Sequence, residues 1–151
     1  MQIIAAFHGT GKSYFTKKYD KEFSIIDLDT SIFSHKIDLF NIKVSNPEFP
    51  HNFISTLTNL NSSYDLALIP IDKHVLNSLI EKNLDFELIY PDVSLRSDYV
   101  LRYIERGSSD DFIRFIDSKF EKLIHEIETD YLSIKKTKLT SKTQFLSNVL
   151  F

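Results

Sequence analysis

The sequence predicts an α/β protein with a three-layer, doubly wound fold. Its short apolar runs are continuous rather than alternating, which is typical of parallel strands that are buried on both faces. Segments of helical period lie between these runs. The 151 residues suit one domain. Ligands of such folds bind at the carboxyl ends of the strands, so the residues that follow each run are the functional candidates.

The first part of the chain alternates strand and helix signals. Residues 2–7 form an apolar run that predicts a buried strand and ends at a glycine-containing turn. Residues 12–20 have the composition of a helix with an aromatic inner side. The run at 23–27 closes on a carboxylate and predicts a second strand. The stretch 30–63 is broken by two prolines and predicts one helix after the second of them.

The same alternation continues through the middle of the chain. Residues 66–70 form a third apolar run that ends at a proline, and 86–90 form a fourth run, followed by another proline. Between them, apolar residues spaced i, i+1, i+4 and i+5 predict a helix at about 72–83. Residues 97–106 are again helical in pattern, with Gly107 in position to end that helix.

The last third predicts one long helix and a final strand. Ser109 is a favourable N-cap, and an apolar stripe with a 3.6-residue period continues to about residue 128. A fifth strand is expected near 132–138 and a closing helix near 145–150. We therefore predict a single domain over residues 1–151.

Composition narrows the classes of function. The chain has no cysteine, which excludes thiolate catalysis and cysteine-ligated metal sites. Its formal net charge of −3 disfavours nucleic acid as a partner without excluding it. No apolar run approaches the roughly 20 residues that span a bilayer, and the N-terminus lacks the pattern of a signal peptide. We expect a cytoplasmic protein without a membrane partner, either a monomer or a small homo-oligomer.

Residues 6–13, Ala-Phe-His-Gly-Thr-Gly-Lys-Ser, fit the Walker A pattern with alanine in place of the first glycine. Such a loop surrounds phosphate with backbone N–H groups. Its lysine bridges the β- and γ-phosphates, and its hydroxyl holds Mg²⁺. The side chain of the loop histidine is expected to point outward. The residues predicted to contact the nucleotide are His8, Gly9, Thr10, Gly11, Lys12, Ser13, Tyr14 and Arg102.

Two carboxylates, Asp27 and Asp29, stand at the end of the second predicted strand. Alternation along an extended chain places them on the same side. Asp27 is predicted to hold Mg²⁺ with Ser13 or to act as a base, and Asp29 to bind the phosphate acceptor. The alternative is structural, because Asp29-Thr30-Ser31 is also a fair helix cap.

Three of the four arginines lie within eleven residues, at positions 96, 102 and 106. Guanidinium groups suit the charge that develops during phosphoryl transfer. Arg102 and Arg106 are four residues apart and are predicted to be catalytic, and Arg96 to bind the substrate. The alternative is a solvated helix face paired with nearby carboxylates.

These residues resemble the P-loop kinases of the nucleoside monophosphate kinase group, and more narrowly the small nucleotide and deoxynucleotide kinases encoded by bacteriophages. The matching parts are residues 6–13, 27–29, 88–91, 96–107 and 144–147. The resemblance implies a parallel sheet of order 2-3-1-4-5, ATP and Mg²⁺ as cofactors, and Arg102 and Arg106 near the phosphates. It also implies an acceptor-binding region within about 30–63 and a short lid at about 92–98.

The predicted function is therefore transfer of the γ-phosphate of ATP to a nucleoside or deoxynucleoside monophosphate. No aspartate ends the third strand, where a Walker B carboxylate would stand, so Asp27 is the predicted substitute. The alternatives are a nucleotide-binding regulator without turnover, a kinase acting on a modified base in DNA, and a kinase of a non-nucleotide small molecule. The Asp-x-Asp arrangement is similar to that of shikimate and gluconate kinases.

Overall fold

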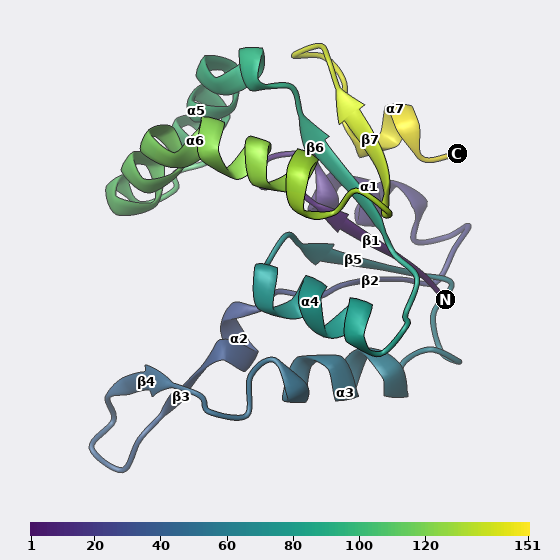
Figure 1. Ribbon diagram of the computed structural model, residues 1–151, viewed down its shortest axis with the longest axis vertical. Coiled ribbons are helices and arrows are strands. Elements are labelled where there is room, and N and C mark those ends of the chain that lie inside the picture. Colours follow the sequence, from purple (N-terminus) through teal and green to yellow (C-terminus); the bar gives the residue numbers. More distant parts are fainter.

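The computed structural model describes all 151 residues and contains one parallel five-stranded sheet (Figure 1). Its spatial order is β2-β5-β1-β6-β7. Counted along the chain, these are the first to fifth strands of the sheet in the order 2-3-1-4-5, which confirms the expected order. Their bounds are β1 (Gln2–Ala6), β2 (Ile25–Asp27), β5 (Leu66–Pro70), β6 (Glu87–Pro91) and β7 (Lys135–Leu139).

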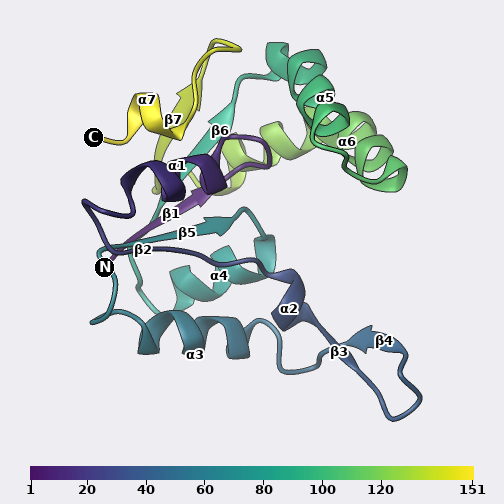
Figure 2. The same cartoon turned by 180° about the vertical axis from the view of Figure 1, so that it is seen from behind.

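Helices cover both faces of this sheet, as Figures 1 and 2 show from opposite sides. One face carries the larger apolar core, formed with α3 (His51–Asn59), α4 (Lys73–Glu81), α5 (Arg96–Glu105) and α6 (Asp110–Asp130). The other carries a smaller core under α1 (Lys12–Tyr19) and α7 (Leu146–Val149). The expected α/β three-layer architecture is confirmed.

The residues of β1 show why the strands read as continuous apolar runs. Ile3, Ala5 and Phe7 belong to the larger core, whereas Ile4 and Ala6 belong to the smaller one. Successive side chains of a strand point to opposite faces. Because both faces are covered by helices, neither set can be polar.

Local signals fix the ends of the helices on the larger face. The Asp72 carboxylate accepts hydrogen bonds from the backbone N–H groups of His74 and Val75 at the start of α4. The Ser109 hydroxyl accepts from Phe112 N–H at the start of α6. Gly107, with φ of +77°, follows the end of α5. These are the positions at which the sequence predicts the helices to begin or end.

The stretch 30–63 contains an element that the sequence did not predict. After a short helix, α2 (Ser31–Ser34), the chain forms an antiparallel hairpin of β3 (His35–Ile37) and β4 (Lys43–Ser45). We call residues 35–45 the arm. Figures 1 and 2 show that it projects from the body of the molecule. The helix expected after Pro50 is present as α3.

The segment 92–98, expected to be a short lid, is helical from residue 93 onward. A 3₁₀ helix, η1 (Val93–Leu95), follows β6 and runs directly into α5. Asp92 caps it by accepting hydrogen bonds from the N–H and hydroxyl groups of Ser94. No helix of the structure combines the length and apolar character needed to cross a membrane.

Candidate functional site

A cleft of about 540 Å³ opens at the carboxyl end of β1. The loop between β1 and α1 forms its floor, α5 forms one wall, and the segment before α7 forms another. This is the edge of the sheet at which ligands of doubly wound folds bind. Its lining residues are His8, Gly9, Gly11, Lys12, Ser13, Tyr14, Arg102, Glu105, Arg106 and Phe145.

Two glycines give the loop its shape. Gly9 and Gly11 have φ angles of +84° and +90°, in the left-handed region that other residues rarely adopt. Both also lie against aromatic rings. A Cβ atom on Gly9 would lie 3.0 Å from Tyr103 Cε1, and one on Gly11 would lie 3.2 Å from Phe145 Cδ1. Conformation and space therefore both require glycine here.

Three consecutive carbonyl groups of the loop are held by neighbouring elements. The Tyr103 hydroxyl donates to His8 O at 2.8 Å, and Arg102 Nη1 donates to Gly9 O at 2.7 Å. The N–H of Leu146, in α7, donates to Thr10 O at 3.0 Å. Helix α5 and the C-terminal segment therefore fix the peptide planes of the loop from outside.

The loop's N–H groups, in contrast, are free. Those of Gly9, Gly11, Lys12 and Ser13 donate no hydrogen bond within the protein, although 87 backbone–backbone bonds form elsewhere. Thr10 N–H donates weakly to Phe7 O at 3.4 Å, and the buried Thr10 hydroxyl donates to the same oxygen at 2.8 Å. A set of free donors at a helix N-terminus favours a bound anion.

Lys12 lies at the centre of the loop, half-buried, with its ammonium group donating to Ala6 O at 3.3 Å. Burial lowers the pKa of this ammonium group. The Asp27 carboxylate opposes that shift, and the positive charge of Arg106 adds to it. Positive charge is thus concentrated at the cleft, where it adds to the attraction for an anion.

Ser13 and Asp27 are brought together across the first two strands of the chain. The Ser13 hydroxyl donates to Asp27 Oδ2 at 3.4 Å, so one cation could contact both oxygens. Loss of water around the Asp27 carboxylate raises its pKa, while Lys12 and the Ser13 hydrogen bond lower it. No cluster of three or more acidic, histidine or cysteine ligands occurs in the structure. A Mg²⁺ ion here would take most of its ligands from water and, in a nucleotide complex, from phosphate oxygens.

Asp29 lies at the start of α2, where its carboxylate accepts hydrogen bonds from the N–H and hydroxyl of Ser31 at 3.1 and 3.0 Å. A carboxylate that accepts from the N–H two residues on forms an Asx turn, which precedes α2, and the N-cap residue, Thr30, makes no side-chain cap bond. Asp29 is not among the residues that line the cleft.

The expectation that His8 points outward is wrong. Its ring meets Phe112 of α6 edge-on, with centroids 5.2 Å apart, and contacts Phe7 in the same way. Burial, together with the positive charge of Lys12, lowers the pKa of His8 to about 4. The ring is therefore neutral at physiological pH. An aromatic pocket on α6, far away in the sequence, holds it.

The three clustered arginines have different positions. The Arg102 guanidinium lies 4.2 Å from the ring centres of both Tyr99 and Phe145, and it donates to two carbonyls, Gly9 O and Lys142 O. Arg106 is exposed at the rim of the cleft, where its Nε donates to the Ser108 hydroxyl at 2.9 Å. Arg96 is not in the cleft, because its Nε forms an ion pair with Asp117 Oδ1 at 2.7 Å.

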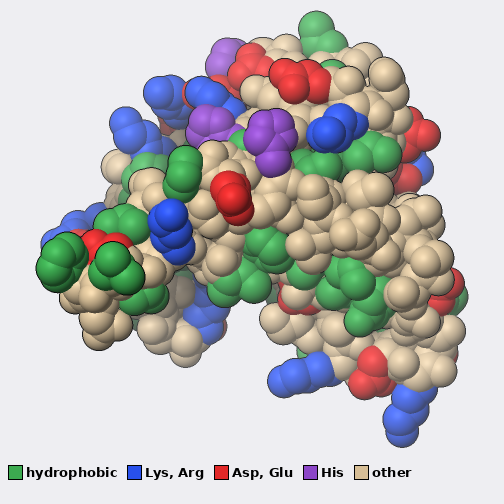
Figure 3. Space-filling view, turned by 90° about the horizontal axis from the view of Figure 1, so that it is seen from below, with side chains coloured by type: hydrophobic (Ala, Val, Ile, Leu, Met, Phe, Trp, Pro, Cys, Tyr) green, Lys and Arg blue, Asp and Glu red, His purple; other side chains and the backbone are tan.

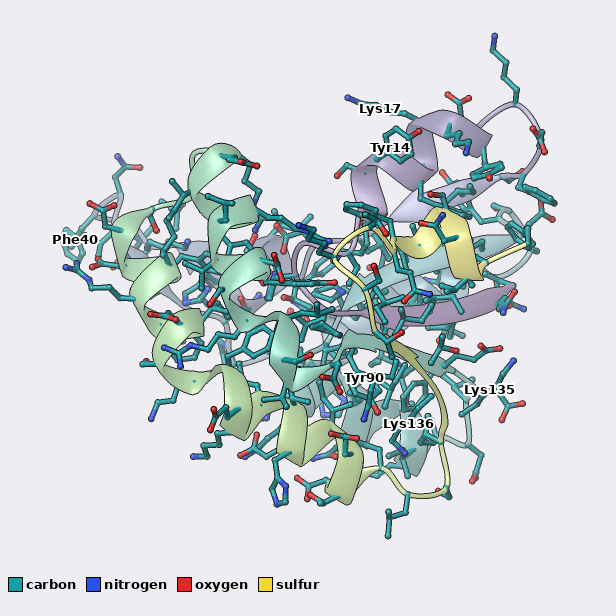
Figure 4. The ribbon with its side chains drawn as sticks, turned by 90° about the horizontal axis from the view of Figure 1, so that it is seen from above. Tyr14, Lys17, Phe40, Tyr90, Lys135 and Lys136 are labelled. Atoms are coloured by element: carbon teal, nitrogen blue, oxygen red, sulfur yellow. The ribbon has the colours of Figure 1, made fainter.

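Two residues that support the cleft, one behind the loop and one in its lining, were not predicted as site residues. Tyr103 holds the loop, and Phe145 packs on both Gly11 and Arg102. In the sequence, Tyr103 is one more apolar residue of a helix stripe, and Phe145 is one of thirteen phenylalanines. Tyr14 lines the cleft as predicted, and Figure 4 shows it on α1 together with Lys17, which is outside the cleft.

In comparisons with known proteins, no protein-family model matches the chain, and no curated protein sequence matches it significantly.

Proposed function

We propose that this chain is an ATP- and Mg²⁺-dependent phosphotransferase of the P-loop kinase type. The observation that carries the proposal is the polarity of the 6–13 loop. Its carbonyls are held from outside, its N–H groups are free, and Lys12 is at its centre. A triphosphate presents several anionic oxygens in a row, which is the ligand that such a donor array suits.

Residues of the cleft fit the steps of phosphoryl transfer. Free loop N–H groups and Lys12 would bind the β- and γ-phosphates, and Arg106, unlike Arg102, has a guanidinium that could move onto the transferred group. Ser13 and Asp27 would hold Mg²⁺, which neutralises phosphate charge when bound. Such reactions need little covalent help from the protein, so positioning and charge supply most of the acceleration.

A nucleoside or deoxynucleoside monophosphate is the proposed acceptor. This part rests on the resemblance of the loop, the Asp27 strand end and the arginine helix to nucleoside monophosphate kinases, together with the sheet order that the structure confirms. Asp27, beside Ser13, would act on an acceptor phosphate through the Mg²⁺ that the two residues would hold, and on an acceptor hydroxyl as a base. The proposed setting is the cytoplasm, where ATP and Mg²⁺ are available.

The test is transfer of label from γ-labelled ATP in the presence of Mg²⁺. The acceptors are a panel of ribo- and deoxynucleoside monophosphates, free sugars and short DNA carrying modified bases. Lys12→Ala is the site variant, and Lys17→Ala, an exposed lysine on the same helix, is the matched control. Label in one acceptor, lost in Lys12→Ala and kept in Lys17→Ala, supports the kinase. Absence of ATP binding to the unmodified protein refutes the nucleotide site itself.

A non-catalytic nucleotide-binding protein is the second candidate. The observation that favours it is that Arg102 is engaged with two carbonyls and two rings, which leaves Arg106, exposed at the rim, as the one guanidinium in the cleft that bonds no backbone carbonyl. This candidate predicts tight Mg²⁺-dependent ATP binding with no labelled acceptor in the panel. Transfer to a modified base or to a sugar would instead establish the kinase with a different substrate.

A further inference from the structure

The arm carries apolar side chains that no other part of the chain covers. Leu39 is 100% exposed and Phe40 is 82% exposed, and Ile37 and Ile42 beside them are more than half exposed. Figure 3 shows this apolar group at the projecting end of the molecule. In Figure 4, Phe40 lies at the opposite end from Lys135 and Lys136. An exposed apolar group of this kind marks an interaction surface.

The shape of the arm indicates how it would be covered. Its strands are three residues long and pair only with each other, and an isolated hairpin of this kind is marginally stable in water. Leu39 and Phe40 lie in the turn between the two strands, and each strand carries one lysine, Lys36 or Lys43. A narrow projecting tip that is apolar favours insertion into a concave site over the pairing of two flat faces.

The same chain presents such a concave site. A groove of about 420 Å³ lies between the start of α4 and the length of α6, and we call it the α4–α6 groove. Its apolar lining includes Phe115, Leu123 and Ile127. Three carboxylates, Asp72, Glu126 and Asp130, line it together with one lysine, Lys73, so the formal charge of its lining is negative. Asp72 caps α4 through two backbone N–H groups, whereas Asp130 forms no ion pair and Glu126 has only a 3.9 Å contact with Lys122.

The arm and the groove are complementary in charge and in polarity. Lys36 and Lys43 form no ion pair in the structure, and the single carboxylate of the arm, Asp38, is occupied by the N–H groups of Phe40 and Ile42. Two unpaired lysines therefore flank an apolar tip, and carboxylates flank an apolar groove. Opposite charges around an apolar contact fix its register and exclude wrong partners.

We propose that two copies of this chain form a dimer by exchanging arms, with the tip residues Leu39 and Phe40 of each copy inserted into the α4–α6 groove of the other. Reciprocal exchange is isologous, so the assembly closes at two copies. Each lysine pair then lies beside the carboxylates of the partner's groove. This proposal does not depend on the function proposed for the phosphate loop.

The first experiment measures the mass of the full chain in solution by sedimentation over a range of concentrations. The unmodified chain is expected to be a dimer. The double variant Leu39→Ser/Phe40→Ser removes two exposed side chains with no packing partner, so it folds normally and weakens dimerisation at least about a hundredfold. Leu101→Ser, half-exposed on α5 and outside the groove, is the matched control and remains dimeric.

A cross-linking experiment then identifies the contact, because the chain has no cysteine of its own. Phe40→Cys and Phe115→Cys proteins are mixed and oxidised under native conditions. A disulfide-linked pair of two different chains is the expected product. A disulfide formed only within a single chain that carries both substitutions would show that the arm folds onto its own groove and would overturn the exchange. A chain that is monomeric at every concentration would also overturn it.

A third experiment reverses the charges of the arm or of the groove. Lys36→Glu/Lys43→Glu in the arm, or Glu126→Lys/Asp130→Lys in the groove, should each weaken the dimer about tenfold or more. In a mixed dimer of these two proteins both arm–groove contacts pair opposite charges, whereas each homodimer pairs like charges twice, so the mixed dimer should form in preference to either homodimer. Failure of the mixture to associate would contradict the proposed charge pairing.

Discussion

Arg102 and Arg106 lie one helical turn apart, yet they should differ sharply when each is replaced by alanine. Arg102 donates to Gly9 O at 2.7 Å and to Lys142 O at 2.6 Å, and it stacks between two rings. Arg106 has one hydrogen bond, to a serine hydroxyl two residues away. The structure therefore assigns Arg102 to the fold and leaves Arg106 available to the ligand.

The contacts give the size of the effect. Hydrogen bonds to a charged donor contribute about 1.5 to 3 kcal/mol each, and a guanidinium stacked on an aromatic ring contributes about 0.5 to 1 kcal/mol at a partly exposed site. Arg102 is only half-buried and its contacts overlap, so we expect Arg102→Ala to lower the free energy of unfolding by about 3 kcal/mol. Arg106→Ala removes one exposed hydrogen bond and two longer ring contacts, at 4.8 Å from Tyr103 and 5.7 Å from Phe112, so we expect about 1 kcal/mol.

Thermal unfolding followed by circular dichroism measures the difference. At about 2 to 4 °C per kcal/mol for a chain of this size, Arg102→Ala should unfold about 6 to 12 °C below the unmodified protein. Arg106→Ala should unfold within about 4 °C of it. If the protein is a kinase, Arg106→Ala should also lower kcat by about a thousandfold or more while leaving ATP affinity nearly unchanged. A normal melting temperature for Arg102→Ala, or equal losses for both variants, would refute the assignment.

Three further outcomes can be measured. Gly107→Ala, where a Cβ would meet nothing within 4 Å, should cost about 1 to 2 kcal/mol from its backbone conformation alone, and Gly9→Ala should cost more in the same urea titration because its Cβ would press on Tyr103. Because the folded chain protonates His8 only below about pH 4 and the unfolded chain protonates it below about 6.5, acidification across that window should destabilise the protein by about 3 kcal/mol through this residue. His8→Asn should remove that part of the pH dependence, which is measured as the change in urea midpoint between about pH 7.5 and 4.5. An equal change in the variant and in the unmodified protein would show that the ring is solvated. Tyr103→Phe should lower the free energy of unfolding by about 1 kcal/mol through the lost bond to His8 O. It should also weaken ATP binding, and an ATP affinity equal to that of the unmodified protein would argue against control of the loop by α5.

The sheet could be predicted from sequence because its strands are buried on both faces. Continuous apolar runs such as 66–70, separated by segments of helical period, are typical of parallel strands covered by helices. The arm gave no comparable signal, since β3 and β4 are three residues each and β3 is exposed throughout. Strand β7 (Lys135–Leu139) begins three residues later than expected, because lysines at the sheet edge hide its boundary.

The site was predictable as a set of residue types but not as a set of contacts. The loop itself follows from a local pattern, so Lys12, Ser13 and the glycines lie where the sequence predicts. Arginine clustering, in contrast, does not indicate which oxygen each guanidinium meets: Arg102 holds backbone carbonyls, and Arg96 pairs with Asp117 on a neighbouring helix. The environment of His8 depends on Phe112, whose approach is a property of tertiary packing alone.

The bond from Leu146 N–H to Thr10 O has a consequence for the order in which this protein folds. The loop and the segment that encloses it come from opposite ends of the described chain, and contacts of such long sequence separation form late and slowly. A growing polypeptide that has completed β1, α1 and β5 therefore still lacks both walls of its cleft, and one that has also completed α5 still lacks the second. If the cleft binds a phosphorylated ligand as proposed, full affinity requires that residues 140–150 have docked, so binding would report on the completion of folding and would stabilise the finished fold selectively.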